Sequence, residues 1–349
     1  MFAFAFEAEG DTPGAEAEGG KPAAPVEATL REAREVRLSE RLVEAETWEV
    51  CRLSVGAHEL RHSLPPEASL PALLGSEEGQ PGIPPPPPSK ERGAAEKGGS
   101  ALAAASDLAA AATSDLIPGV YEGGFKLWEG TRDLLEVLHE MCAAGELALD
   151  GAAVLEAGCG AGLPGALAMR LGCRTCVLCD YNPSVLSTLT MQTIRLNGLW
   201  PRAESGALRF LSGDWASVTA LLSEERSAAT ARQELVAATA EALASGPFDL
   251  ILSAETIYSV DSSARLWQLI RDQLRPGGTA LVAAKSYYFG VGGSVADFKA
   301  RVESAEPSGE FGWRVLRTFE DGASNRRVCV AVTRKKAESA ESGLTCDPK

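Results

Sequence analysis

Short apolar runs bounded by turn residues recur along the last two-thirds of the chain. Five of them lie at residues 153–155, 176–178, 208–211, 250–252 and 280–283. Continuous apolar runs of this length are typical of strands that are buried on both faces of a parallel sheet. We therefore predict five buried parallel strands.

Longer segments between these runs have helical character. They cover residues 164–171, 183–196, 216–244 and 262–274, the third being rich in Ala and Glu. Helices that alternate with parallel strands form an α/β sandwich. Two later runs, 313–316 and 328–332, are joined across Asp321 and Gly322, and we expect an antiparallel pair that closes the sheet.

The first third of the chain is organised differently. We expect residues 1–29 to be a disordered tail, because they hold little apolar content. Residues 30–64 include an alternating strand pattern and are predicted to be a small segment that packs on the main domain. Residues 65–113 form a Pro/Gly/Ala-rich linker with a proline run. The main domain is assigned to 114–335 and a second disordered tail to 336–349.

Composition narrows the possible partners. The 349 residues carry a formal net charge of -15, which disfavours direct contact with nucleic acid or a membrane surface and suits a basic protein partner. No apolar stretch is long enough for a membrane span. Several cysteines fall in apolar runs, so we expect a reducing compartment and no metal site. We also expect a monomer. We assign the chain to the cytoplasm, and the short basic cluster 334–336 leaves entry into the nucleus or nucleolus open.

A glycine-rich turn follows the first predicted strand. It contains Gly158, Gly160 and Gly162, preceded by Glu156. Glycines let the backbone approach a ligand closely, but this pattern serves nicotinamide and flavin dinucleotides as well as S-adenosylmethionine. Glu156 favours S-adenosylmethionine, because dinucleotide domains usually carry a small or apolar residue there.

Two further acids follow the next two strands. Asp180 is placed to accept the ribose hydroxyls, although it could instead cap the following helix. Gly213, Asp214 and Trp215 follow the third strand, where the acid can bind the adenine amine and the indole can cover the ring. Trp215 could also be an ordinary core residue. We interpret this set as an S-adenosylmethionine site.

The fourth strand ends at a turn with two candidate catalytic residues, Glu255 and Tyr258. Strand carboxyl ends are where open α/β sheets bind ligands, so both should lie beside the sulfonium. The Glu-x-x-Tyr spacing is similar to the acid-x-x-Tyr signature of a family of protein methyltransferases that includes many lysine-directed enzymes.

Three strings narrow this resemblance: SDLIPGVYEGGFKLWEG at 114–130, DLILSAETIY at 249–258 and AKSYYFGVGG at 284–293. Together they resemble the histidine-specific protein methyltransferase branch, whose substrate is a large-subunit ribosomal protein. The resemblance covers about residues 114–333. It implies the seven-strand Rossmann-like fold of S-adenosylmethionine-dependent methyltransferases, with a mostly parallel sheet and an antiparallel C-terminal strand pair.

The resemblance and the motifs together give the predicted cofactor contacts. They are Leu127, Trp128, Glu129, Gly130, Thr131, Glu156, Gly158, Gly160, Asp180, Tyr181, Asn182, Gly213, Asp214, Trp215, Ser253, Ala254 and Glu255. Glu156 stands where the family commonly has Asp, and Asp214 where it commonly has Glu. Both replacements keep the charge.

Methyl transfer to a neutral imidazole needs positioning more than acid-base chemistry. We expect Glu255 or Tyr258 to orient the substrate ring through the nitrogen that is not attacked. Five aromatic residues are predicted to wall the site: Phe125, Trp128, Tyr287, Tyr288 and Phe289. The chain's own histidines, His58, His62 and His139, are interpreted as structural.

Three other functions compete with this hypothesis. A lysine-directed methyltransferase shares the Glu-x-x-Tyr turn. A noncatalytic, cofactor-binding assembly factor for a ribosomal protein fits the net charge, but it has no chemical reason to keep every cofactor motif. A nicotinamide-dependent dehydrogenase is disfavoured by Glu156 and by the residues after the third strand.

Overall fold

The computed structural model describes residues 31–40, 49–64, 114, 116–117, 119–233, 248–304, 309–322 and 324–336. The tail predicted at 1–29, the linker predicted at 65–113 and residues 337–349 of the second tail lie outside the described residues. So does the end of the Ala/Glu-rich segment, after residue 233.

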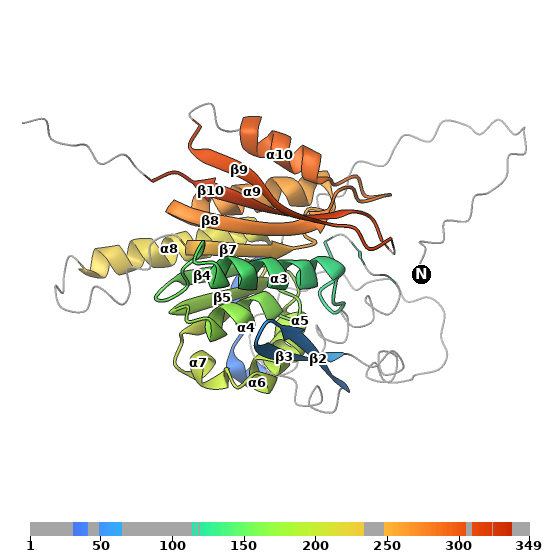
Figure 1. Cartoon of the computed structure of the whole chain (residues 1–349). Helices are drawn as coiled ribbons and strands as arrows, with labels where there is room; N and C mark the ends of the chain where they lie inside the picture. The colour runs from blue at the N-terminus through green and yellow to red at the C-terminus, as the bar shows by residue number, and fades with distance from the viewer. Residues whose placement is uncertain are drawn as a thin grey trace, which may run out of the picture.

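One large sheet forms the centre of the described chain (Figure 1). Its strand order is β1-β6-β5-β4-β7-β8-β10-β9. The strands are β1 (Arg34–Glu35), β4 (Ala153–Ala157), β5 (Thr175–Asp180), β6 (Leu208–Ser212), β7 (Phe248–Ala254), β8 (Leu274–Lys285), β9 (Phe311–Phe319) and β10 (Arg327–Arg334). Neighbours among β4 to β8 pair in parallel, and β10 is antiparallel to both β8 and β9. The predicted fold class is confirmed.

The sheet has one strand more than predicted. The two-residue strand β1 pairs antiparallel with β6, Arg34 opposite Ser212 and Glu35 opposite Leu211. It comes from the N-terminal part of the chain, so residues far apart in sequence share this edge. Two residues are too few for a hydrophobic pattern to mark a strand.

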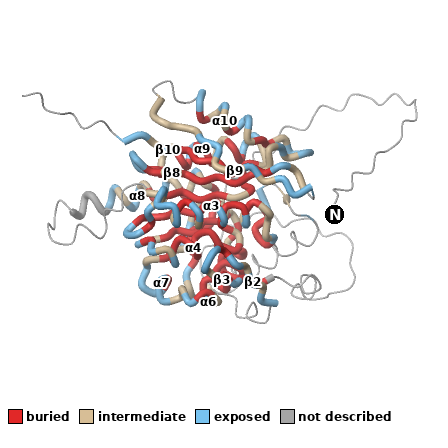
Figure 2. Tube along the Cα trace, in the orientation of Figure 1, coloured by how far each residue is buried: buried red, intermediate tan, exposed pale blue. Residues whose placement is uncertain are grey.

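Helices cover both faces of the sheet. One face carries α3 (Glu129–Ala143), α4 (Leu163–Arg170), α5 (Pro183–Val185), η3 (Leu186–Thr190), α6 (Met191–Leu196) and α7 (Trp200–Glu204). The other carries α8 (Trp215–Gln233), α9 (Val260–Gln273) and α10 (Val295–Ser304). Helices α3, α7 and α10 were not predicted from the sequence. Figure 2 shows the buried strands between these two layers.

Alternating strand residues divide the core in two. Val154 of β4 packs in the cluster that includes Leu134 and Leu138 of α3. Leu155, the next residue, packs in the cluster that includes Leu266 and Ile270 of α9. Successive strand side chains point to opposite faces, so a fully apolar strand feeds both layers.

A separate two-stranded hairpin, β2 (Glu49–Val55) and β3 (His58–Leu64), lies beside α4 and α6. A short helical turn, η1 (Leu38–Glu40), precedes it. The backbone N–H of Arg61 donates to Asn197 Oδ1 at 3.1 Å, and Arg170 donates to the Glu59 carbonyl at 2.7 Å. The segment predicted from residue 30 thus contributes both β1 and this hairpin.

The helix predicted over 183–196 contains a π-helical turn, η3. The wider turn lets Thr190 Oγ1 donate to the Gly160 carbonyl at 2.6 Å and contact the Val185 carbonyl at 3.2 Å. Single π turns inside α-helices are frequent at functional sites. Here the turn holds the glycine-rich loop after β4.

Candidate functional site

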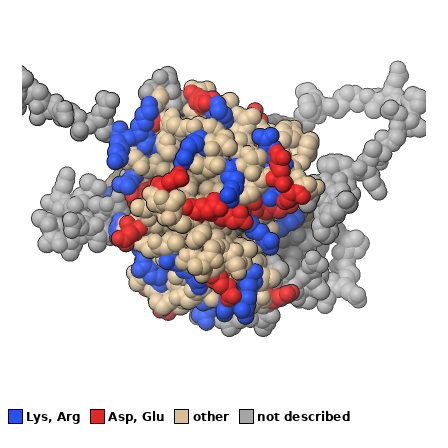
Figure 3. Space-filling model, viewed as in Figure 1, with Lys and Arg blue, Asp and Glu red and all other residues tan. Residues whose placement is uncertain are grey.

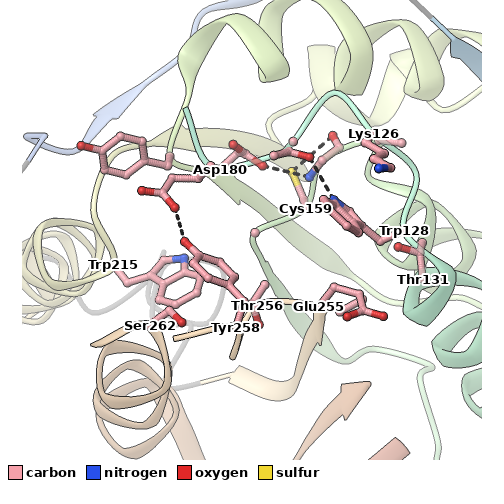
Figure 4. A pocket seen from close by; sticks show the side chains of 18 of the residues that line it. Lys126, Trp128, Thr131, Cys159, Asp180, Trp215, Glu255, Thr256, Tyr258 and Ser262 are labelled. Carbon is pink, nitrogen blue, oxygen red and sulfur yellow. Dashed lines mark hydrogen bonds between the residues drawn. The ribbon is translucent and has the colours of Figure 1, made fainter. Parts of the chain in front are cut away.

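A pocket of about 800 Å³, including its open mouth, lies at the carboxyl ends of β4, β5, β6 and β7. Its walls come from residues within the segments 122–131, 158–161, 180–181, 213–215 and 254–258, together with Ser262 and Arg265 of α9. Figure 4 shows how the side chains of these segments converge. Parallel strands bring their carboxyl ends to one edge, so loops distant in sequence form one site.

The glycine-rich loop after β4 has no room for side chains at Gly158 and Gly160. Gly158 and Gly160 have φ of 66° and 48°. A Cβ on Gly158 would stand 2.7 Å from Thr256 Cγ2, and one on Gly160 would stand 3.0 Å from the Gly124 carbonyl oxygen. The backbone therefore forms a smooth floor that a flat ligand can approach closely.

Asp180 ends β5 with a fixed, buried carboxylate, 4% exposed. Its Oδ2 accepts the Gly160 N–H at 2.9 Å, and its Oδ1 accepts the Asn182 N–H at 3.1 Å. These bonds fix the carboxylate's orientation beside the pocket, and carboxylate oxygens can accept further hydrogen bonds. A ribose diol is a chemically suitable donor.

Asp214 follows β6, and its two oxygens have different partners. Oδ1 accepts the Ala216 N–H at 2.9 Å, and Oδ2 forms an ion pair with Arg265 at 2.9 Å. Arg265 lines the pocket but was missed by sequence analysis, because it sits 51 residues later on α9. Trp215 lines the same side, where its indole is half-buried.

Glu255 has a backbone conformation unusual for a residue with a side chain, with φ of 59°. Its Oε1 accepts the Gly130 N–H at 3.1 Å, and its Oε2 accepts the Tyr288 hydroxyl at 2.5 Å. Burial raises the pKa of this carboxyl, although the Tyr288 hydrogen bond and Lys285 oppose the shift. Left-handed backbone in non-glycine residues clusters at functional sites.

Tyr258 reaches across the pocket to the opposite wall. Its hydroxyl donates a hydrogen bond to Glu122 Oε2. Burial, together with the Glu122 charge, raises the Tyr258 pKa, so the phenol stays neutral. Glu122 is itself held, since its Oε1 accepts the Gly119 N–H at 2.8 Å.

Glu156 lies behind the glycine loop and is 3% exposed. Its Oε2 accepts the Gly165 N–H at 2.7 Å, near the start of α4. Burial raises the Glu156 pKa to about 8, the Gly165 hydrogen bond lowers it, and the Asp180 charge raises it. Near pH 7 this carboxyl is therefore largely protonated in the protein without a bound cation.

Most predicted contact residues line the pocket. These are Leu127, Trp128, Thr131, Gly158, Gly160, Asp180, Tyr181, Gly213, Asp214, Trp215, Ala254 and Glu255, and Tyr258 joins them. Nine further residues line the pocket and were not predicted from the sequence: Glu122, Gly123, Gly124, Lys126, Cys159, Ala161, Thr256, Ser262 and Arg265. The first four lie within the string 114–130, which could have indicated them.

Five predicted contact residues are set behind the wall instead. Glu129 pairs with Lys285 at 3.2 Å, and Gly130 donates to Glu255. Glu156 accepts the Gly165 N–H of α4. Asn182 is fully buried and donates to the Val120 carbonyl at 2.8 Å, while Ser253 donates to the Ala157 carbonyl at 2.9 Å. Each supports a lining segment without facing the hollow.

The predicted aromatic wall is only partly formed. Trp128 lines the pocket, and its indole N–H donates to the Gly123 carbonyl at 3.0 Å. Tyr288 does not line the pocket, but its hydroxyl donates to Glu255. Phe125 packs in the core instead. Tyr287 and Phe289 point to solvent, with exposures of 45% and 70%.

The three histidines lie away from the pocket lining. The rings of His58 and His139 meet edge to face at 5.7 Å between hairpin and α3. His62 is buried, which lowers its pKa.

Among the described residues, no group of three His, Cys, Asp or Glu side chains is placed to hold a metal ion. No helix in the same residues has the length and apolar character needed to span a bilayer.

The pocket lining carries four acids against two bases. The acids are Glu122, Asp180, Asp214 and Glu255, and the bases are Lys126 and Arg265. Such a surface attracts a cation and repels a diphosphate. The charge therefore fits a sulfonium cofactor better than a nicotinamide dinucleotide.

The chain is similar to several known proteins. The family described as "Methyltransferase domain" matches residues 129–305. A histidine protein methyltransferase 1 homolog of Dictyostelium discoideum is 36% identical over 64% of this chain and 61% of its own length. The Rattus norvegicus homolog is 33% identical over 60% and 56%. A T. thermophilus 16S rRNA methyltransferase structure aligns at 15% identity with a TM-score of 0.41, covering 83% of this chain and 51% of the other.

The names of these relatives confirm the resemblance predicted from the sequence. The match to a methyltransferase family also supports S-adenosylmethionine as the cofactor, as predicted. The chain spans about three-fifths of the length of the curated relatives that it matches.

Proposed function

The chain belongs to the methyltransferase domain family, and from this membership we propose that it methylates an imidazole nitrogen of a histidine in a large-subunit ribosomal protein. The observation that carries the proposal is the placement of Glu255 and Tyr258 in the same acidic pocket as Asp180. A cofactor anchor and two groups able to orient an acceptor thus face one hollow.

The residues present fit S-adenosylmethionine. Asp180 is oriented to accept the ribose hydroxyls, and Trp215 can cover the adenine ring. The backbone at Gly158 and Gly160 leaves room for the rest of the cofactor. Bound S-adenosylmethionine supplies an electrophilic methyl group on a positively charged sulfur. The acids of the lining stabilise that charge.

Glu255 and Tyr258 can fix the tautomer of the acceptor ring. The Tyr258 hydroxyl proton is directed to Glu122, which leaves an oxygen lone pair free to accept an imidazole N–H. The Glu255 oxygens offer a second acceptor in the same pocket. A ring that donates its N–H to either group presents the lone pair of its other nitrogen to the methyl group.

The same groups handle the charge that develops on the ring. The imidazole would take the methyl group from the bound cofactor's sulfur and with it the positive charge. The nearby carboxylates of Glu122 and Glu255 stabilise this cation. The remaining N–H proton then leaves to a carboxylate or to water, which restores a neutral methylimidazole.

A lysine acceptor is the main alternative, and the pocket charge disfavours it. A lysine must lose a proton from a pKa of about 10.4, and adjacent acids raise that value further. An imidazole near its ordinary pKa of about 6.5 starts far closer to the reactive neutral form, although the same acids act on it.

The ribosomal acceptor is supported by the specific strings at 114–130 and 284–293 and by charge. Ribosomal proteins are basic as a class, because they bind RNA, and a chain of net charge -15 attracts them. This part of the proposal names the acceptor and needs its own test.

The test is mass spectrometry after incubation with isotope-labelled S-adenosylmethionine. Ribosomal proteins from cells lacking this protein serve as acceptors. We expect label on one histidine of a single large-subunit protein. Label on lysine contradicts the histidine assignment, and no label despite cofactor binding would favour a noncatalytic assembly factor.

Two variants control the experiment. Asp180→Asn removes the buried carboxylate beside the pocket and should weaken cofactor binding at least about tenfold, so that labelling falls severalfold at subsaturating S-adenosylmethionine. Asp272→Asn changes a partly exposed acid of α9 that does not line the pocket, and its labelling should match the wild type.

A further inference from the structure

Exposed apolar side chains gather near the mouth of the pocket. Seven large hydrophobic side chains of the described chain are exposed, and four of these are Val260, Tyr287, Phe289 and Val291. A fifth, Val120, precedes Glu122 on the opposite wall. Scattered exposed apolar residues are ordinary, but a group beside a ligand site marks a contact surface. We call these five residues the apolar rim.

The turn that carries the aromatic residues is fixed to the Glu-x-x-Tyr turn. The Gly293 N–H donates to the Tyr258 carbonyl at 2.9 Å, and Ser259 pairs with Gly292. A Cβ on Gly293 would stand 2.1 Å from the Ile257 carbonyl oxygen, so the two backbones touch. The rim therefore keeps a constant position relative to Tyr258.

The turn is also rigid within itself. The Tyr288 N–H donates to the Gly293 carbonyl at 2.8 Å, and the Gly292 N–H donates to the Tyr288 carbonyl at 3.0 Å. The ring centroids of Tyr287 and Phe289 are 5.0 Å apart, and the angle between the ring planes is 71°. Outward rings on a hydrogen-bonded turn lose little entropy on binding, as interface anchors require.

The opposite side of the mouth is tied to the same framework. Tyr258 bonds Glu122, and the Tyr181 hydroxyl donates to the Gly119 carbonyl at 2.9 Å. The Asn182 amide holds the Val120 carbonyl at 2.8 Å. Val120 thus stands on a segment anchored both to the cofactor loop and to Tyr258.

We propose that the apolar rim binds the acceptor polypeptide at the residues next to the methylated side chain, and that it selects aliphatic or aromatic side chains there. This inference rests on the proposed function, which places a protein side chain in the pocket. The segments flanking that side chain must cross the mouth, where the rim lies. The charged residues of the lining face the pocket, and the residues of the apolar rim are exposed outside it. The rim therefore contacts the residues that flank the methylated side chain.

The test uses 15-residue peptides with a central histidine, in which the flanking positions carry Leu, Phe or Ser. Methylation rates with S-adenosylmethionine are compared for the wild type, Phe289→Ser and Tyr287→Ser. We expect the wild type to prefer Leu or Phe flanks, and each variant to lose about tenfold in kcat/KM on those peptides. The affinity for S-adenosylmethionine, measured by calorimetry, should not change.

Val315→Ser is the matched control. Val315 is 53% exposed on β9 and lies outside the rim, so its replacement should leave the peptide preference intact. Equal preference for Leu, Phe and Ser flanks by the wild type, or full activity of Phe289→Ser on the preferred peptides, would overturn the rim alone. Absence of histidine methylation by the wild type, on peptides and on ribosomal proteins, would overturn the proposed function and the rim with it.

Discussion

The Glu156 carboxyl shows how strongly burial alters a single residue. Its pKa is about 8 in the folded protein, and 4.5 is its ordinary value. Between these two values the folded state holds a proton that the unfolded state has lost. The free energy of unfolding therefore falls as pH rises through this window, by up to about 1.4 kcal/mol per pH unit.

Glu156→Gln should remove that pH dependence, because an amide can still accept the Gly165 N–H but has no proton to lose. Without cofactor, we expect the variant to gain stability relative to the wild type between pH 5 and pH 8.5. Urea unfolding at the two pH values measures the change. Glu204→Gln, at an exposed position, is the control, and parallel pH profiles for wild type and Glu156→Gln would show the expectation to be wrong.

Other residues act through precise pairwise contacts. Tyr288 holds Glu255, Glu122 holds Tyr258, and Arg265 holds Asp214. The sequence indicated one member of each pair as a site residue, but only Tyr288 among the partners was singled out, and then as a wall residue. A partner on another element leaves no local pattern.

At the scale of elements, residues 31–33, which lead into strand β1, reinforce the part of the pocket formed by the loops after β5 and β6. The Arg31 carbonyl accepts the Asp214 N–H at 2.9 Å, and the Arg31 guanidinium lies 4.8 Å from the Tyr181 ring centroid. Ala33 packs closely against Gly213: a Cβ on Gly213 would stand 2.7 Å from the Ala33 Cα. This segment therefore orders two of the cofactor loops.

Arg31→Ala should weaken S-adenosylmethionine binding about three- to tenfold, because Tyr181 loses its stacked cation. Calorimetric titration measures the dissociation constant. Arg34→Ala is the matched control, since Arg34 pairs with Glu40 on the same segment without touching the pocket. Equal weakening by both variants would assign the effect to the segment as a whole and not to Arg31.

A buried ion pair attaches α3 to β10. Arg327 Nε and Asp133 Oδ2 are 2.6 Å apart, and both side chains are less than 10% exposed. The pair positions the helix whose Gly130 N–H binds Glu255. The contact links the stability of the C-terminal strands to the geometry of the site.

Arg327→Met should destabilise the fold by about 3–5 kcal/mol, because it leaves the Asp133 charge buried and unpaired. Urea unfolding gives the value, with the exposed Arg326→Met as control. Replacing both partners, Asp133→Leu with Arg327→Met, should recover most of the loss. A single variant as stable as the wild type would contradict this account.

At the scale of the whole molecule, charge governs association. Figure 3 shows a band of acidic side chains over α3, where Glu136 and Glu140 face Arg317. With a net charge of -15, the protein should attract a basic acceptor at long range, and salt screens such attraction within about 10 Å at 0.1 M.

We therefore expect the KM for a basic protein acceptor to rise severalfold between 50 and 300 mM NaCl. The S-adenosylmethionine dissociation constant should change less, because its contacts lie inside the pocket. Initial rates at several salt concentrations test this, with calorimetry of cofactor binding as control. A KM that does not depend on salt would count against electrostatic attraction.

Seven of the eight strands of the sheet, the parallel direction of five of them, and the glycine loop with Asp180 were predictable from the sequence. These features are local: apolar runs mark buried strands, and glycine permits positive φ wherever it stands. Which side chains meet depends on the packing of the folded chain. Arg265 and Asp214 are 51 residues apart, Tyr258 and Glu122 are 136 apart, and Arg31 and Tyr181 are 150 apart. Such contacts depend on how whole elements pack, and no short-range pattern in the chain encodes that packing.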